Sequence, residues 1–368
     1  MTIEMIKPPA EVLHERELAA LAAEGLGKRP PNWKLSPAAV RDFLIGREKP
    51  IELDGEKVHI TRKFYGNDVL IERAVVTLAG NRGLMLVGEP GTAKTMLSEL
   101  LSAAISGTST NTIQGTAGTT EDTIKYSWNY AMLLDKGPSE AALVPSPLYQ
   151  GMKHGLITRF EEITRCPSEA QDSLISIMSD KVMNIPELAD GVLFAKPGFN
   201  VIGTANIRDK GVNEMSSALK RRFNFETIRP IENVKMEAKI IESQASNLLS
   251  HSGVDIEVDP DVVELLATTF IELRTGRTRE GYKIEVPQAV MSTAEAVSVY
   301  VQSAMTSYYY EEGGLSMERL VQNMLGTVAK ESTKDLSVLK AYFSKVVKER
   351  ARTESLWDAY YKEKKWIG

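Results

Sequence analysis

The chain has 368 residues, 25% charged and 43% hydrophobic, which is typical of a globular protein with about two or three domains. Its net charge of −5 provides no overall positive field for nucleic-acid backbones. No apolar run approaches the roughly 20 residues that span a bilayer, and residues 1–9 lack the apolar core of a secretory signal. The single cysteine, Cys166, excludes an internal disulfide and fits a reducing compartment, so we expect a cytoplasmic protein.

Residues 1–50 have the pattern of an N-terminal helical appendage. Apolar spacing predicts a helix over Glu11–Ala23, which the glycine and prolines of Gly25–Pro31 terminate. A second helix is predicted to start with Ser36 as its cap and Pro37 at its first helical position. Nothing in this segment carries obvious chemistry.

Residues 51–230 alternate apolar strands with helices, which predicts an α/β core with a parallel sheet. The predicted strands are Leu84–Val87, Thr112–Gln114, Leu156–Phe160, Phe199–Thr204 and Phe225–Ile228. The predicted helices are Asp68–Leu78, Thr95–Ser106, Pro167–Met178 and Met215–Arg221.

Two stretches interrupt this alternation and read as β-hairpin inserts. The first covers Ile124–Tyr149, with its turn at Asp135–Pro138. The second covers Val182–Lys196, with Asp190-Gly191 as its turn. Residues 231–368 then predict an all-α lid domain. Its helices are expected after the Asp259-Pro260 cap and over Pro287–Val301, Met317–Ala329 and Asp335 to about Tyr361.

The most informative stretch is Gly88–Thr95, which reads Gly-Glu-Pro-Gly-Thr-Ala-Lys-Thr between a strand and a helix. Glycines let the backbone curl so that its N–H groups face an anion, and the following helix N-terminus adds positive charge. Lys94 would reach the outer phosphates of ATP, and the Thr95 hydroxyl would hold Mg²⁺. The predicted nucleotide-binding residues are Gly88, Glu89, Pro90, Gly91, Thr92, Ala93, Lys94, Thr95 and Met96.

Ala93 departs from the usual pattern, which has glycine immediately before the lysine. An alanine fits there if its φ stays negative, which the first turn of a helix permits. The alternative is a chance loop that binds no nucleotide. The flanking strand and helix disfavour that alternative.

Glu161 and Glu162 follow a predicted buried strand, where a phosphate loop needs an acidic neighbour. Glu161 would hold Mg²⁺ through water, and Glu162 would orient or deprotonate the attacking water. Two solvated glutamates at a strand end are the alternative. Arg159, inside the same strand, has no explanation from the sequence.

Two further pieces complete a candidate ATPase site. Asn206 ends a predicted strand, from which its amide would bind the γ-phosphate and water between the phosphate loop and the acidic strand. Alone, this asparagine fits a turn residue better, and it is the two preceding pieces that favour the functional interpretation. Arg222, or as second choice Arg221, would be an arginine finger for a neighbouring subunit, although cations also suit a helix C-terminus.

With these four pieces in order, the chain resembles an AAA+ ATPase, and among these the MoxR family, which also has alanine before the loop lysine. The resemblance runs over about 58–297 and includes Ser146-Pro147-Leu148-Tyr149 ahead of the acidic strand. It implies that Lys94 and Thr95 belong to Walker A, Glu161 and Glu162 to Walker B, and Asn206 to sensor 1.

The chain departs from the family at two positions. Glu161 stands where aspartate is usual, and Gln288 after Pro287 stands where a sensor 2 arginine is common. Arg277 or Arg279 would have to substitute for that arginine. Both departures affect the expected hydrolysis rate more than nucleotide binding.

The resemblance implies a ring, expected to be a hexamer, that couples ATP hydrolysis to remodelling or maturation of a client protein. Relatives of this type act with partners that carry a von Willebrand factor A domain. One alternative is an ATP-binding switch or scaffold with little hydrolysis, which Glu161 and Gln288 favour. A nucleic-acid translocase is a second alternative, which the net negative charge disfavours.

Overall fold

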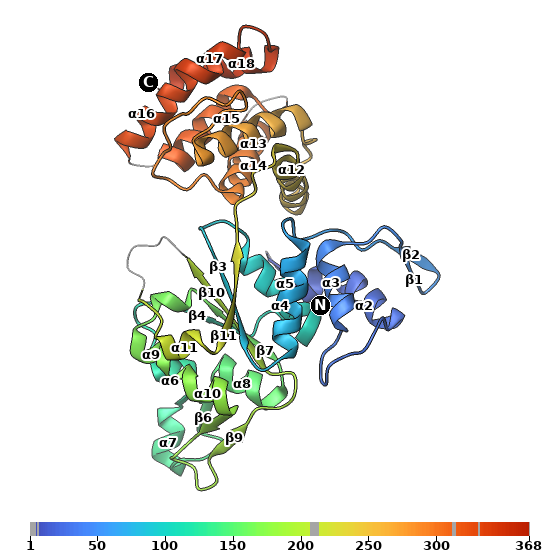
Figure 1. The fold of residues 1–368 in the computed structure, drawn as a ribbon, viewed down its shortest axis with the longest axis vertical. Helices are drawn as coiled ribbons and strands as arrows, with labels where there is room; N and C mark the ends of the chain where they lie inside the picture. Colours follow the sequence, from blue (N-terminus) through green and yellow to red (C-terminus); the bar gives the residue numbers. More distant parts are fainter. Residues whose placement is uncertain (1–4, 6, 207–212, 311–313, 330–331, 368) are drawn as a thin grey trace. The chain divides into compact units, whose positions relative to one another are not determined.

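The structure is a computed structural model that describes residue 5 and residues 7–206, 213–310, 314–329 and 332–367 (Figure 1). The chain divides into two compact units. The first contains the described residues up to Glu89 and those from Ala93 to Ile228, and the second contains Pro90–Thr92 and the described residues from Arg229 onward. The predicted class, an α/β core with a parallel sheet and a helical C-terminal region, is confirmed.

A five-stranded sheet organises the first unit, with the strand order β11-β3-β10-β7-β4 and every neighbouring pair parallel. The strands are β3 (Gly83–Gly88), β4 (Thr112–Gln114), β7 (Ile157–Glu161), β10 (Asn200–Asn206) and β11 (Phe223–Ile228). Each lies within two residues of its predicted limits. Because all strands run the same way, the loops at their carboxyl ends meet at one edge of the sheet.

Helices cover both faces of the sheet, since alternate side chains of each strand point to opposite faces. Leu84 and Leu86 of β3 pack into one core and Met85 packs into the other. The first core includes side chains of α4 (Asp68–Ala79) and α5 (Lys94–Ser106). Further helices of this unit are α6 (Glu121–Ile124), α8 (Pro147–His154), η1 (Ile163–Arg165), α9 (Ser168–Asp172), α10 (Leu174–Asp180) and α11 (Ser217–Lys220).

The N-terminal segment packs into the first of these cores. It forms α1 (Ala10–Leu13), α2 (Glu15–Glu24) and α3 (Pro37–Ile45), followed by an antiparallel pair of strands, β1 (Ile51–Leu53) and β2 (Glu56–Val58). Leu21 and Phe43 are fully buried there. The Ser36 hydroxyl accepts from the Ala39 amide at 3.2 Å, as the capping pattern predicts. Residues expected to form an appendage therefore share the hydrophobic core of the sheet.

Both inserts form antiparallel strand pairs. The turn predicted in the first insert is wrong, whereas Asp190-Gly191 in the second lies in a turn, with the Gly191 amide donating to the Leu188 carbonyl at 3.1 Å. In the first insert, α7 (Tyr130–Lys136) lies between β5 (Tyr126–Trp128) and β6 (Leu143–Pro145), so Asp135-Lys136 ends a helix instead of making a turn. The Asn129 side chain caps that helix by accepting from the Met132 amide. In the second insert, residues 185–191 connect β8 (Val182–Asn184) to β9 (Val192–Phe194), and Asp190-Gly191 ends this connection.

The second unit is helical and has its own hydrophobic core. Its elements are α12 (Val234–His251), α13 (Pro260–Thr275), α14 (Thr293–Tyr310), α15 (Met317–Met324), a π-helix (Leu325–Ala329), α16 (Thr333–Tyr342), a second π-helix (Phe343–Val347), α17 (Lys348–Arg350), α18 (Ser355–Lys362) and η4 (Glu363–Trp366).

Several predicted helices have different limits in the structure. The helix expected from Pro287 begins at Thr293, because Asp335 accepts from the amides of Gln288 and Ala289 and holds them in a loop. The last helix is interrupted between Arg350 and Ser355. The helix predicted over 167–178 is divided at Ser173.

Candidate functional site: a phosphate loop beside a buried acid

The phosphate loop connects β3 to α5, as predicted. Lys94 begins α5 and is only 8% exposed. Its Nζ donates to the carbonyl oxygens of Gly88 at 3.2 Å and Glu89 at 2.6 Å. The ammonium group therefore turns back over the loop, where it would meet the outer phosphates of a bound nucleotide.

The expectation that Ala93 has a negative φ is wrong. Its backbone is left-handed, with φ 63° and ψ 23°, and Gly91 has φ 73°. The left-handed region costs a residue with a Cβ about 1–2 kcal/mol. The buried strand before the loop and the buried helix after it fix the curl of the loop, so tertiary structure overrides the local preference of alanine.

Glu161 ends β7 and is 3% exposed. Its Oε2 accepts from the Thr95 hydroxyl at 3.0 Å, which joins the phosphate loop to the acidic strand. A hydroxyl and a carboxylate oxygen are ligands that suit Mg²⁺, which takes its remaining ligands from phosphates and water. The described residues hold no cluster of three or more His, Cys, Asp or Glu side chains for a metal, so this pair is the candidate donor set.

Glu162 lies one residue beyond the strand and also has a left-handed backbone, with φ 53°. Its amide donates to the Thr204 hydroxyl of β10 at 2.9 Å. Its carboxylate pairs with Arg165 at 2.7 Å. Left-handed residues other than glycine concentrate at functional sites, and both Ala93 and Glu162 border this one.

Asn206 ends β10, which lies between β3 and β7 in the sheet. In the parallel register Asn206 is paired with Gly88, the last residue before the loop. The structure thus places this asparagine between the phosphate loop and the acidic strand, where the sequence predicts it.

Three residues that sequence reasoning left out connect these pieces. Ser98 and Thr204 each donate a hydrogen bond to Glu161, and Arg159 forms an ion pair with it at 2.8 Å. Helical spacing offered a signal for Ser98, which lies three residues after Thr95 and so on the same face of α5. Strand alternation offered a similar signal for Thr204, which lies two residues before Asn206 and so on the same face of the strand.

Arg221 and Arg222 lie at the other end of the sheet. They precede β11, and the Gly83 amide at the start of β3 donates to the Arg222 carbonyl at 2.9 Å. The phosphate loop follows the end of the same strand, about 16 Å further along. Arg222 donates to Ser179 and to the Ala218 carbonyl, whereas Arg221 is exposed. Both arginines therefore lie far from the phosphate loop of this chain.

The residues considered for sensor 2 lie in the helical unit. Gln288 is in the loop before α14, so it does not open a helix as expected. Arg279 pairs with Glu280 at 3.1 Å and with Glu354. Arg277 is exposed.

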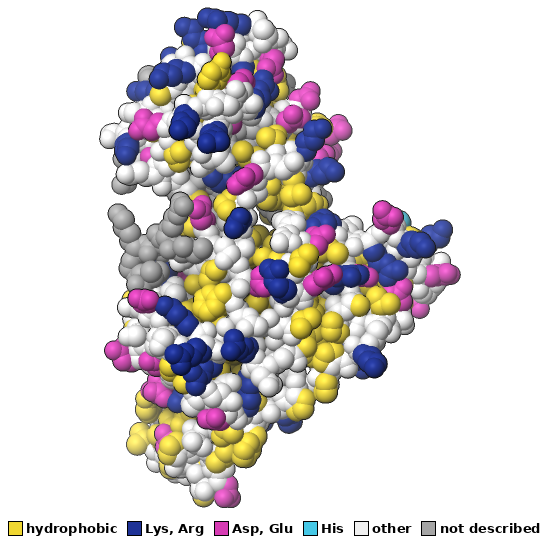
Figure 2. Space-filling view, viewed as in Figure 1, with side chains coloured by type: hydrophobic (Ala, Val, Ile, Leu, Met, Phe, Trp, Pro, Cys, Tyr) yellow, Lys and Arg dark blue, Asp and Glu magenta, His cyan; other side chains and the backbone are white. Residues whose placement is uncertain are grey.

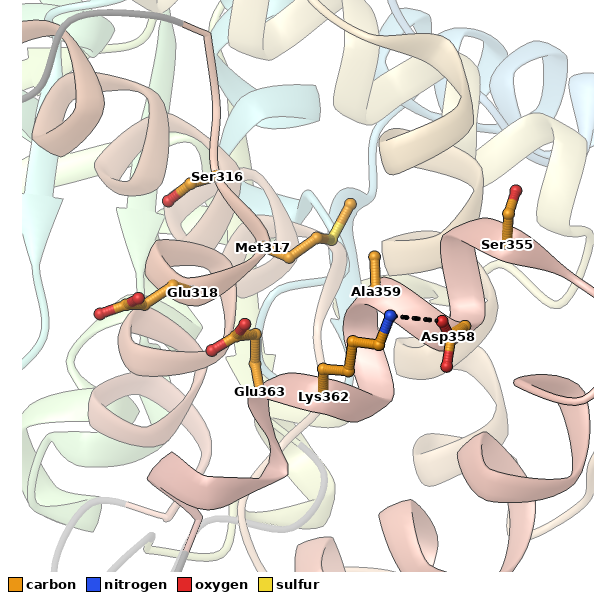
Figure 3. A pocket seen from close by; sticks show the side chains of 8 residues that line it. All are labelled: Ser316, Met317, Glu318, Ser355, Asp358, Ala359, Lys362 and Glu363. Atoms are coloured by element: carbon orange, nitrogen blue, oxygen red, sulfur yellow. Dashed lines mark ion pairs between the residues drawn. The ribbon is translucent and has the colours of Figure 1, made fainter.

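A pocket of about 620 Å³ also lies in the helical unit, between α15 and α18 (Figure 3). Lys362 and Asp358 form an ion pair at 2.7 Å on its wall. Ser316, Met317, Glu318, Ser355, Ala359 and Glu363 complete its lining. None of the predicted nucleotide-site residues lines it, so this pocket is separate from the ATP chemistry predicted from the sequence.

No helix in the described part of the chain is long and apolar enough to cross a membrane.

Known proteins match both units. Residues 83–223 match the AAA domain of the dynein-related subfamily, and residues 235–368 match the YehL-like AAA+ ATPase C-terminal domain. YehL of Escherichia coli (strain K12) is 47% identical over 96% of both chains. The protein SH1500 of Staphylococcus haemolyticus is 27% identical over 39% of this chain and 54% of its own. A structure of NtrX from Brucella abortus aligns with a TM-score of 0.50 at 11% identity, covering 83% of this chain and 69% of that one.

The fold and the phosphate loop define an AAA+ ATPase with a P-loop nucleotide-binding core. The chain belongs to the YehL-like family of AAA+ ATPases. This confirms the MoxR-type AAA+ resemblance drawn from the sequence.

The left-handed backbone of Ala93 gives a first prediction. Ala93→Gly should raise the free energy of unfolding by about 1 kcal/mol, because glycine adopts this conformation without a Cβ clash. Urea denaturation monitored by circular dichroism measures the change. The control is Ala22→Gly, on the exposed side of α2, where glycine should cost about 1 kcal/mol. Equal destabilisation by both substitutions would contradict the conformation assigned to Ala93.

Proposed function

We propose that this chain is an ATP- and Mg²⁺-dependent ATPase that remodels or matures a client protein. The observation that carries the proposal is that Lys94, Glu161 and Asn206 meet at one edge of the sheet. The Thr95 hydroxyl bonds to Glu161, and Asn206 is paired in register with Gly88, the residue before the loop. These residues come from three separate elements that only the fold brings together. The lone buried cysteine is consistent with a cytoplasmic location.

Each residue has a role that its position supports. Lys94 would exchange its bonds to the loop carbonyls for phosphate oxygens, and Asn206 would hold the γ-phosphate and the attacking water. A bound Mg²⁺ would neutralise charge on the phosphates, held by Thr95 directly and by Glu161 through water. Glu162 would accept the proton of the attacking water, after its carboxylate leaves Arg165.

Glu162→Gln should abolish ATP turnover and leave ATP binding intact. Glutamine keeps the shape of the side chain but has no charge with which to activate water. Phosphate release measures turnover, and equilibrium binding of a fluorescent ATP analogue measures affinity. Glu169→Gln, an exposed acid in α9, is the matched control and should turn over ATP at the wild-type rate.

The same assay separates the ATPase from a nucleotide-dependent switch. A switch would bind ATP equally well in the wild type and in Glu162→Gln, with no phosphate release from either. Stimulation of turnover by DNA or RNA in a salt-dependent way would instead indicate a translocase.

A ring, which we expect to be a hexamer, explains why both candidate finger arginines lie at the far end of the sheet from their own loop. A guanidinium in that position can only complete a neighbour's site. Arg221 is the better candidate in the structure, because its side chain is exposed while Arg222 is bound to Ser179 and Ala218. This reverses the order of preference that the sequence suggested.

Arg221→Ala should therefore lower turnover by on the order of 10³-fold, with little effect on ATP affinity. Arg222→Ala should mainly lower stability. A mixture of Arg221→Ala with Glu162→Gln should regain part of the turnover, because some interfaces then combine an intact Glu162 with an intact Arg221. No recovery in the mixture, at protein concentrations where rings form, would contradict action between subunits.

The two inserts are the candidate client surface. Both expose apolar side chains, with Tyr130 and Leu134 of α7 74% and 89% exposed and Phe194 of β9 69% exposed. Figure 2 shows hydrophobic side chains at the end of the α/β unit that carries the inserts. Tyr130 and Leu134 are four residues apart and so share one helix face. Exposed apolar side chains of this size suit a protein partner, and we expect one with a von Willebrand factor A domain.

A trapped ring tests this surface. Tagged Glu162→Gln with ATP should retain its partner, and adding Leu134→Ser with Phe194→Ser should release that partner, since both anchors lose their apolar area. Mass spectrometry of the purified complexes identifies the retained protein. Val76→Ser is the control, because Val76 is 66% exposed but lies on α4. Retention by every variant would exclude the inserts.

A further inference from the structure

The middle of β7 holds a buried cation that the proposed mechanism does not use. Arg159 is 4% exposed. Its Nε donates to the Ser98 hydroxyl at 2.9 Å, and its Nη1 donates to the Ser109 carbonyl at 2.7 Å and to the Thr112 hydroxyl at 3.1 Å. Its Nη2 donates to Glu161 Oε1 at 2.8 Å. Every nitrogen of this guanidinium has a partner, so its position is fixed.

The carboxylate of Glu161 is equally constrained. Oε1 accepts from Arg159 and Ser98, while Oε2 accepts from Thr204 at 2.7 Å and Thr95 at 3.0 Å. A carboxylate accepts about four hydrogen bonds, and these four use that capacity. The two oxygens therefore have separate partners. One faces the guanidinium, and the other faces the hydroxyl of the phosphate loop.

We propose that Arg159 and Glu161 form one unit, in which Arg159 is a positioning residue that presents Oε2 of Glu161 toward the Mg²⁺ site at Thr95. The inference rests on the proposed ATP- and Mg²⁺-dependent function. Residues 159 and 161 are two apart on one strand and so point to the same face of the sheet. A buried guanidinium needs a carboxylate partner, and Glu161 supplies it without leaving Thr95.

The unit explains why this chain has glutamate where the related ATPases usually have aspartate. Aspartate is shorter by one C–C bond of about 1.5 Å, so its carboxylate cannot reach both Arg159 and Thr95 from the same backbone. An aspartate that lost the contact with Arg159 would leave a buried guanidinium without its main counter-charge. An aspartate that lost the contact with Thr95 would leave the metal site without its acid. The glutamate is thus matched to the arginine.

A double-mutant cycle tests the unit with four proteins: wild type, Glu161→Asp, Arg159→Met and the variant with both substitutions. The measured quantity is the ratio of affinities for a fluorescent ATP analogue with Mg²⁺ and with EDTA, which reports metal binding without turnover. Each single substitution should lower this ratio on the order of tenfold, and the double variant should regain most of it. Methionine fills the space of the arginine stem without a charge, which frees the aspartate to face Thr95.

Glu99→Gln is the matched control. Glu99 also contacts Arg159, at 3.4 Å, but it is more exposed, and the Thr95 hydroxyl donates to Glu161 and not to the Glu99 carboxylate. It should change the Mg²⁺ ratio little, whereas a loss equal to that of Glu161→Asp would show that charge alone matters and would overturn the positioning role.

The remaining outcomes separate the two proposals. If the losses of the two single variants simply add in the double variant, or if Glu161→Asp strengthens Mg²⁺-dependent binding, Arg159 does not position Glu161. If wild type itself ignores ATP, the proposed function fails instead. Single variants that unfold while the double variant stays folded support the unit. In that case the two substitutions compensate each other in stability, which shows the same coupling between Arg159 and Glu161. Should both Arg159→Met proteins unfold, Arg159→Lys replaces them in the cycle, and additivity there overturns the proposal.

Discussion

The buried carboxylate of Glu161 is the point at which the candidate site is held together. It accepts hydrogen bonds from Thr95 of the phosphate-loop helix, from Thr204 of β10 and from Arg159 of its own strand. Such a group is costly to bury unless every acceptor position is satisfied. Because its partners come from α5, β7 and β10, satisfying the carboxylate also fixes the relative positions of the three elements that would handle phosphate, metal and water.

The parallel sheet makes this meeting possible. β10 lies between β3 and β7, so the ends of the three strands present the phosphate loop, Asn206 and the two glutamates side by side. The same geometry places Arg221 and Arg222 at the opposite end, where β11 and β3 begin. The candidate finger arginines and the phosphate loop therefore lie at opposite ends of the sheet, and this separation is the physical argument for the ring that we propose.

Local strain accompanies the chemistry. Ala93 and Glu162 both have left-handed backbones, and neither is a glycine. In each case the neighbouring elements are buried and hydrogen bonded, and the Glu162 amide is itself held by Thr204. The packing energy of the core outweighs a cost of about 1–2 kcal/mol at each residue. The packing of the core therefore holds both the phosphate loop at Ala93 and the acid Glu162 in these strained conformations.

The sequence by itself determined the class of the protein, because the spacing from Gly88 to Thr95 and the order of strands and helices are local patterns with local physical causes. The five sheet strands fell near their predicted limits, since apolar runs of this length have few alternatives to a buried parallel strand. The positions of Lys94, Glu161 and Asn206 followed from strand ends. Capping by Ser36 was likewise readable, as it depends only on the four consecutive residues from Ser36 to Ala39.

Only the tertiary structure decided the rest. The left-handed Ala93 and the late start of α14 contradict local preference, and each is imposed by packing or by a partner distant in the sequence. The helix α7 is different, because its Asn129 cap and its Ala-Met-Leu-Leu run are local signals. Arg159 is the clearest case. In the sequence it is an unexplained charge in an apolar strand, and in the fold it is the counter-ion of Glu161. Alternation along β7 puts Arg159 and Glu161 on one face, but only the packing of α5 and β10 against β7 buries the pair and supplies Ser98 and Thr204 as its partners, and that packing depends on the whole domain.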